Sequence, residues 1–355
     1  MGKRNQLIRL VAVAFAFLTG CAPEAPPGES GESALGPDLE ALPGGELGAQ
    51  DIATNGTLLN GIATNGTELA GVAVTGVGVN ATVFTGRTID GTPMSGPAFV
   101  GTTMNGIKPD NTVLKIRIDA MTALPAPNAD LYGYTVSFDG VNGAKEYICG
   151  LDPAGQPVQA IPIMGTWNYG QGVTGGGSFT PSTTMFTFAC RGMAIGKCIE
   201  LGYRPWQAIA GGGTLQNHLN ACTRALRADY CGNGKSYTLN GTVINLYDVV
   251  SVQADTESWP VEAEWTANGA RFITTGTKKR YKLLGGDPPP CANQLESAST
   301  GNLANFSSGT LIMTEYTNDL LLTPPPRSGS RPPPPGAGVA RGAPYVLEWA
   351  VRREG

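Results

Sequence analysis

The feature that most constrains the fold of this chain is a group of six cysteines between residues 149 and 291. Four of them bracket two stretches whose apolar residues have helical spacing, one over 191–201 and one over 214–230. Gly202 follows the first stretch and Thr214 opens the second, as expected for a helix stop and a helix N-cap. A short connection separates the two stretches, so we expect an antiparallel helix pair.

An antiparallel pair brings cysteines of similar spacing together. We therefore predict disulfides between Cys198 and Cys222 and between Cys190 and Cys231, which leaves Cys149 to pair with Cys291. Disulfides of this kind persist outside the cytoplasm.

A metal or redox site is not expected. The sequence has no Cys-x-x-Cys motif, and His218 is its single histidine. We therefore predict no metal and no cofactor.

Residues on both sides of the cysteine-rich stretch alternate between apolar and polar, as strands do. The pattern is clear over 112–119, 131–138, 184–190 and 242–248. The expected fold class is therefore α+β, with a disulfide-stapled, β-rich domain over 110–291 that contains the helix pair.

Glycine recurs at every fifth position from 56 to 106, with Ala81 in the single missing slot. An apolar residue stands two positions before most of these glycines. The pattern resembles the pentapeptide-repeat family, whose five-residue units build a square β-helix with the apolar residue inside. The resemblance implies a β-helix-like stalk over 51–108, and a flexible Gly/Thr stalk is the alternative. In either form, spacing or self-association is the expected role.

The N-terminus has the pattern of an exported bacterial lipoprotein. Residues 1–20 combine basic residues with a short apolar core, and the ending Leu18-Thr19-Gly20-Cys21 resembles a lipobox. We expect 1–20 to be a signal peptide and Cys21 the site of lipid attachment, followed by a disordered tether over 21–50. Ala22 resembles the residue found in lipoproteins of the outer membrane. The domain is then displayed in the periplasm or at the cell surface.

Several motifs resemble those of the ADYC-domain family, which is named for the tetrapeptide at 228–231. The family consists largely of bacterial envelope lipoproteins, and the domain has no established activity. The resemblance therefore implies a class of protein without a mechanism. The residues that carry it are Cys190-Arg191-Gly192, Gly196-Lys197-Cys198, Gly202-Tyr203-Arg204-Pro205-Trp206, Ala221-Cys222-Thr223-Arg224 and Arg227-Ala228-Asp229-Tyr230-Cys231-Gly232. A Pro-rich C-terminal extension follows over 292–355.

Four side chains are candidates for a functional role. Asp229 falls in the last turn of the second helix, where a carboxylate needs a partner, and Arg227, Arg224 or a following backbone amide can serve. His218 lies beside the apolar stripe of that helix, as a packing histidine or a general base. Glu262 and Glu264 share one face of a strand, either a solvated face or an acid and base pair for glycoside cleavage.

The expected function is a non-enzymatic binding or structural role in the cell envelope. The alternative is a secreted hydrolase that uses carboxylates such as Asp229, Glu262 or Glu264. We expect the membrane as a partner through the lipid anchor, together with an envelope protein or glycan. Nucleic acid is excluded, because the formal net charge is −4 and no basic cluster is present.

Overall fold

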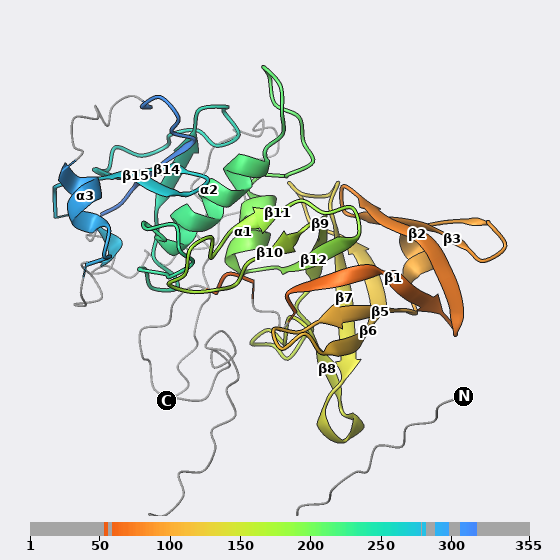
Figure 1. Cartoon of the computed structure of the whole chain (residues 1–355). Coiled ribbons are helices and arrows are strands. Elements are labelled where there is room, and N and C mark those ends of the chain that lie inside the picture. Colours follow the sequence, from red (N-terminus) through yellow and green to blue (C-terminus); the bar gives the residue numbers. More distant parts are fainter. Residues whose placement is uncertain (1–52, 56–58, 278, 282–287, 298–305, 318–355) are drawn as a thin grey trace, which may run out of the picture. The chain divides into compact units, whose positions relative to one another are not determined.

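A computed structural model describes residues 53–55, 59–277, 279–281, 288–297 and 306–317 (Figure 1). All described residues belong to one compact unit. The predicted signal peptide, Cys21 and the tether lie outside the described residues, as does 318–355. None of the helices in the described ranges is both long and apolar enough to cross a membrane.

Six antiparallel strands form a closed ring. Their order around the ring is β1 (Gly61–Leu69), β5 (Thr102–Ile107), β6 (Val113–Ala123), β7 (Tyr132–Asp139), β9 (Ala160–Met164) and β12 (Met185–Cys190). The ring closes where Ile62 of β1 pairs with Phe186 of β12. The short strand β8 (Lys145–Tyr147) pairs with β7 outside the ring.

The stretch with glycine at every fifth position is a β-meander, so the predicted β-helix-like stalk is wrong. Beyond β1 it continues through β2 (Val72–Asn80), β3 (Val83–Thr88), β4 (Pro93–Ser95) and the 3-10 turn η1 (Gly96–Phe99) into β5. Positive φ angles mark the turns between these elements, at Gly71, Ala81, Gly91 and Gly101.

The five-residue spacing has a structural reason. The turn residues are ten positions apart, and Gly66 and Gly76, which fall midway, also have positive φ angles. Both lie where the strand register shifts, between Ala63 and Glu68 and between Thr75 and Gly78. From Gly66 to Gly76, glycine thus alternates between β-bulges and a turn, both of which favour it.

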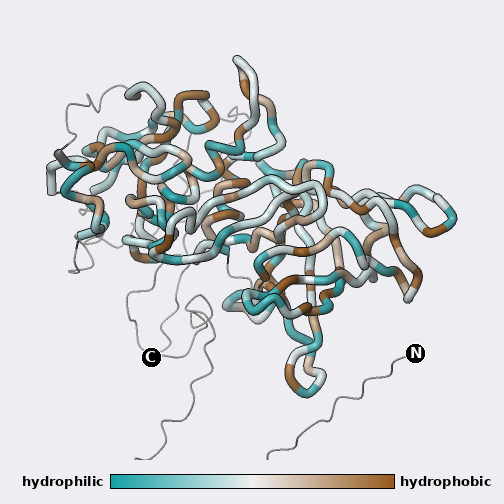
Figure 2. Tube along the Cα trace, viewed as in Figure 1, coloured by the Kyte–Doolittle hydropathy of each residue, from teal (hydrophilic) through white to brown (hydrophobic). Residues whose placement is uncertain are grey.

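The interior of the ring is filled with aromatic side chains. Phe84 of β3 lies at the centre of this core, with its ring centroid 5.4 Å from that of Phe99, 5.0 Å from Phe186 and 5.1 Å from Tyr134. Phe84 and Phe99 come from the glycine-repeat stretch, whereas Phe186 and Tyr134 come from β12 and β7. The repeat stretch therefore shares one hydrophobic core with the rest of the ring, and hydrophobic residues are interspersed along its strands (Figure 2).

A second hydrophobic core lies between helices and a four-stranded sheet. The sheet order is β13 (Asn245–Asp248), β16 (Ile312–Glu315), β14 (Val261–Thr266) and β15 (Gly269–Ile273). Helix α2 (Gln216–Arg227) packs on this sheet and on α1 (Ala194–Glu200), and α3 (Ala292–Ser297) packs on β15. The small hairpin of β10 (Thr166–Trp167) and β11 (Phe179–Thr180) contributes Trp167 and Phe179 to this core.

The predicted α+β fold class is wrong, because the described part of the chain is mainly β. Both helices form within the predicted ranges, but strands predominate among the described residues, and the largest element is the closed six-stranded ring. The strand β16 also comes from the stretch after 292 that the sequence suggests is an extension, and it occupies an inner position in its sheet.

All six cysteines between 149 and 291 form disulfides. Cys198 pairs with Cys222, as predicted, with 5.9 Å between the two Cα atoms. The other two predicted pairs, Cys190–Cys231 and Cys149–Cys291, are wrong. Cys190 pairs instead with Cys149, and Cys231 pairs with Cys291. Cys190 is the last residue of β12 and lies in the ring core together with Cys149, not at the start of a helix.

Candidate functional site

The candidate site is the turn that follows α2 and contains the tetrapeptide Ala228-Asp229-Tyr230-Cys231. Ala228 ends the helix in the left-handed conformation, with φ 51° and ψ 38°, and is fully buried. The N–H of Asp229 donates to the carbonyl of Arg224 at 2.9 Å, which satisfies a free carbonyl at the helix end. The side chains of the next three residues, Asp229, Tyr230 and Cys231, each contact a different part of the fold.

Asp229 forms a buried ion pair with Arg224, and each side chain is 2% exposed. Its Oδ2 accepts hydrogen bonds from Arg224 Nη1 and from the N–H of Gly234, the latter at 2.9 Å. Its Oδ1 accepts the N–H of Asn233 at 3.0 Å. The carboxylate thus neutralises a buried cation and also fixes the backbone after the turn. Of the expected partners Arg227, Arg224 and a following amide, Arg224 and two following amides bind Asp229, whereas its expected place in the last turn of the helix is wrong because it lies after α2.

Arg224 connects the turn to three other points in the fold. Its Nε donates to the carbonyl of Ala267 at 2.7 Å, its Nη1 to that of Gly176 at 3.2 Å, and its Nη2 to Ser178 Oγ at 2.9 Å. Ala267 lies in the β14–β15 turn, whereas Gly176 and Ser178 precede β11. One guanidinium therefore holds together the end of α2, the β14–β15 turn of the sheet and the loop that precedes β11.

Tyr230 reaches a second buried ion pair. Its hydroxyl donates to Glu262 Oε1 at 2.6 Å, and its ring stacks on Trp265 with centroids 5.2 Å apart. Burial raises the pKa of Tyr230 well above its usual value of 10, so the phenol keeps the proton that it donates. Arg280 Nε lies 2.9 Å from both oxygens of Glu262, and Thr314 Oγ1 donates to Oε2 at 3.0 Å.

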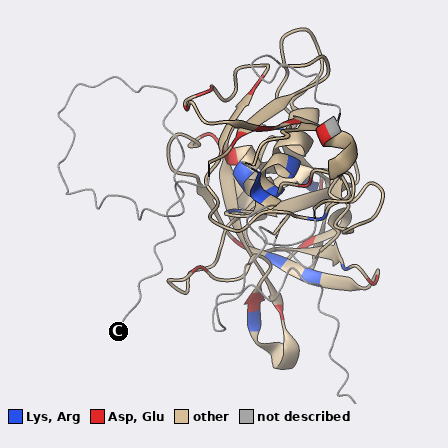
Figure 3. Ribbon diagram, turned by 90° about the vertical axis from the view of Figure 1, so that its left-hand side faces the viewer, with Lys and Arg blue, Asp and Glu red and all other residues tan. Residues whose placement is uncertain are grey.

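Glu264 has a separate set of partners. Its Oε1 accepts Ser307 Oγ at 2.9 Å, and its Oε2 accepts the hydroxyl of Thr310. Glu262 and Glu264 are both fully buried, so the predicted solvated strand face is wrong. The two carboxylates are bound by different residues, and neither is paired with the other. Figure 3 marks the positions of basic and acidic residues along the ribbon.

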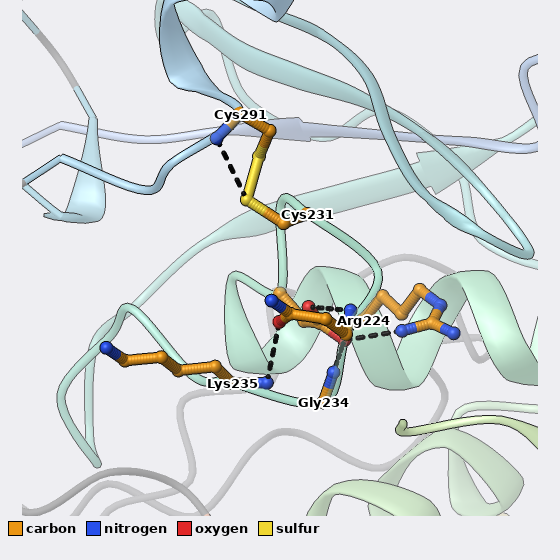
Figure 4. The surroundings of a disulfide bond; sticks show 7 residues. Arg224, Cys231, Gly234, Lys235 and Cys291 are labelled. Carbon is orange, nitrogen blue, oxygen red and sulfur yellow. Dashed lines mark hydrogen bonds and ion pairs between the residues drawn. A yellow bond between two sulfur atoms is a disulfide. The ribbon is translucent and has the colours of Figure 1, made fainter. Parts of the chain in front are cut away.

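Cys231 completes the turn through its disulfide with Cys291, with 5.6 Å between the Cα atoms. The N–H of Cys291 also donates to Cys231 Sγ at 3.3 Å. Figure 4 shows this disulfide next to the end of α2, with the hydrogen bonds around Arg224 and Gly234 on the other side of the turn. The tetrapeptide is thus tied by an ion pair, a phenol and a disulfide to three separate segments.

Backbone segments meet so closely at this turn that only glycine fits. A Cβ on Gly232 would lie 1.7 Å from the carbonyl oxygen of Asn268. A Cβ on Gly234 would lie 2.2 Å from the carbonyl oxygen of Gly170. Both glycines also have positive φ angles, of 64° and 82°. The sequence after the tetrapeptide is therefore set by packing as well as by turn geometry.

His218 does not join the tetrapeptide site. It lies in the first turn of α2, is 3% exposed, and stacks parallel to Tyr203 at 6.4 Å between centroids. Burial lowers the pKa of His218, and the nearby carboxylate of Asp248 partly opposes this effect. The structure therefore separates the four candidate side chains into four environments: one around Asp229, one around Glu262, one around Glu264 and one around His218.

The sequence reasoning did not identify Arg280, Ser307, Thr310 or Thr314 as partners of the two buried glutamates. These residues lie 18 to 52 positions away from the glutamate that they contact. The available signal was the presence of two acidic residues in an apolar strand, which requires buried partners. Within the described ranges, no group of three His, Cys, Asp or Glu side chains is arranged to hold a metal ion.

The ring, the three disulfides and the tetrapeptide turn define a disulfide-stapled, mainly β protein with two cores. The family model of the ADYC domain matches residues 96–279, which is more than half of the chain. The chain belongs to the ADYC-domain family. Comparisons with curated proteins and with solved structures gave no match.

Proposed function

We propose that this chain is a bacterial cell-envelope lipoprotein whose ADYC domain has a non-enzymatic binding or structural role. In this proposal Cys21 carries the lipid, and the domain is held at the outer membrane on the tether of residues 21–50. The lipobox-like sequence before Cys21 supports the anchor. The three disulfides support an oxidising compartment outside the cytoplasm.

The observation that supports a non-enzymatic role is the burial and hydrogen bonding of the three candidate carboxylates. Asp229, Glu262 and Glu264 are at most 1% exposed, and both oxygens of each accept hydrogen bonds. A general acid or base must reach the substrate and exchange a proton with it. These carboxylates would have to break buried contacts to do so, which favours a structural role for them over the hydrolase alternative.

The anchor is tested by feeding cells a labelled fatty acid and comparing the wild type with Cys21→Ala. We expect the wild type to be labelled and to fractionate with the outer membrane, and the variant to lose both properties. Ala22→Asp serves as the matched control, because it leaves the thiol in place and is expected to keep the label while changing the membrane fraction. An unlabelled wild type, or a label that persists in Cys21→Ala, contradicts the anchor.

The non-enzymatic role is tested by crosslinking on intact cells, followed by purification of the full chain. A reproducible envelope protein or glycan in the crosslinked material is the expected result. The hydrolase alternative is tested separately by incubating the purified full chain with cell-wall glycan and peptide substrates. Hydrolysis that is lost in a folded Glu264→Gln variant, but kept when the exposed Glu146 is changed to Gln, overturns the proposal.

A further inference from the structure

The single histidine of the chain occupies an unusual position. His218 is buried in the first turn of α2, and neither of its ring nitrogens has a hydrogen-bond partner among the described residues. A neutral imidazole in this place already forgoes hydrogen bonds with water. An imidazolium carries a full charge and two donors, so the cost of burying it without acceptors is much greater.

The carboxylate that could accept a hydrogen bond from a protonated His218 is that of Asp248, and it already accepts hydrogen bonds from other groups. Tyr203, whose ring lies parallel to that of His218, donates its hydroxyl to Asp248 Oδ2 at 2.8 Å. Asp248 also accepts the backbone N–H groups of Val250, Val252 and Gln253. Burial raises the pKa of Tyr203 well above 10, so this phenol stays protonated and keeps its bond to Asp248.

Several of the other charged groups on the elements around α2 form ion pairs or hydrogen bonds with residues other than His218. Asp248 is the charge that favours a proton on His218, and burial outweighs it. Glu262 is paired with Arg280, Glu264 is bound by hydroxyls, and Glu200 is paired with Arg191. The charged and titratable groups on these elements and in the segment directly after α1 are Lys197 and Glu200 on α1, Tyr203 and Arg204 after α1, Arg224 and Arg227 on α2, Tyr247 and Asp248 on β13, Glu262 and Glu264 on β14, Arg271 on β15, and Glu315 on β16.

The chain around His218 is built so that a local movement is possible and a larger one is prevented. Gly211, Gly212 and Gly213 precede α2, have positive φ angles and have open space where a Cβ would be. This exposed hairpin projects from the fold ahead of α2 (Figure 1). One helical turn beyond His218, the disulfide from Cys222 to Cys198 fixes α2 to α1. A displacement at His218 is therefore confined to residues 207–218.

We propose that His218 is the trigger of a proton-operated latch. Neutral His218 holds the first turn of α2 against the core, and protonation releases this turn, together with the hairpin of residues 207–214 attached to it, as the pH falls. The released state presents Tyr203 and the imidazolium at the surface, so the face offered to a partner differs between neutral and acidic surroundings. This latch goes beyond the proposed envelope role and does not depend on it.

The first test uses the full chain with its disulfides intact. Because there is one histidine, its imidazole gives a single pair of proton signals by NMR, and we expect them to titrate with a midpoint below 6.5. Hydrogen exchange is then compared at pH 7.5 and pH 5 after correction for the intrinsic rates. We expect residues 207–218 to exchange at least about tenfold faster at the lower pH, with β6 and β7 unchanged as the internal control.

Two variants separate the latch from general acid sensitivity. His218→Phe keeps a flat ring against Tyr203 but cannot take a proton, so its exchange at 207–218 should not respond to pH. Tyr203→Phe keeps the ring and removes the phenol's hydrogen bond from Asp248 Oδ2, so the histidine midpoint should rise. A wild-type midpoint at or above 6.5, or equal acid-induced exchange in His218→Phe, overturns the latch. If His218→Phe does not fold, the wild-type titration and Tyr203→Phe decide.

Discussion

The buried pair of Asp229 and Arg224 allows a quantitative prediction about the stability of the domain. Asp229→Asn keeps the size of the side chain and one oxygen for the N–H of Asn233, but it removes the negative charge. Arg224 then remains as a buried cation without a counter-ion. Removing one partner of a buried ion pair costs about 3–5 kcal/mol in the free energy of unfolding.

The structure places the expected cost at the lower end of that range. Arg224 keeps its hydrogen bonds to the carbonyls of Ala267 and Gly176 and to Ser178, so the charge is not left without acceptors. We therefore expect a loss of about 3 kcal/mol, a large part of the roughly 5–15 kcal/mol that stabilises a typical domain.

The assay is equilibrium unfolding in urea at pH 7, followed by circular dichroism with the disulfides intact. The matched control is Glu68→Gln, which breaks the surface pair with Lys115, whose side chains are 41% and 58% exposed. That change should cost at most about 1 kcal/mol. The double variant Arg224→Gln with Asp229→Asn should lose less than the sum of its two single changes. If Asp229→Asn costs no more than Glu68→Gln, the ion pair does not stabilise the turn as argued.

Two further predictions concern backbone packing and alkaline pH. Gly232→Ala should lower the free energy of unfolding by well over the roughly 1 kcal/mol of a left-handed alanine, because its Cβ meets the carbonyl of Asn268. Gly211→Ala, where the Cβ has open space, should show only the cost of the left-handed conformation. Equal losses of stability in thermal unfolding would refute this prediction. Burial raises the pKa of Tyr134 to about 12, above its unfolded value of 10, so its contribution to stability is present below pH 10 and is lost as the pH rises toward 12. Tyr134→Phe should flatten the alkaline fall in unfolding free energy, and an unchanged slope would contradict the assignment.

The parts of the fold that local spacing determines could be predicted from the sequence. The two helices follow from apolar residues three and four positions apart, and the Cys198–Cys222 disulfide follows from packing those helices together. The partner of Asp229 could also be predicted, because Arg224 is only five residues earlier, in the helix that ends just before Asp229. In each case the interacting residues lie close together in the chain or on one predicted element.

The remaining features depend on pairings between distant segments. Ile62 and Phe186 close the ring although they are more than a hundred residues apart in the chain. The sequence of neither strand identifies the other as its partner. The five-residue glycine pattern was misassigned because half of a ten-residue hairpin repeat has the same spacing as a β-helix unit. Cys190 was misassigned for a related reason, since the end of a strand and the start of a helix are adjacent there.

The closure of the ring by β1 determines how much of the chain must be kept together for the protein to fold. The matched family region, 96–279, lacks β1, the inner sheet strand β16 and Cys291. In a fragment cut at those limits, β5, β12, β13 and β14 would each lose a neighbouring strand, and Cys231 would have a free thiol. A fragment designed to fold must therefore include β1, β16 and Cys291 as well as the matched family region.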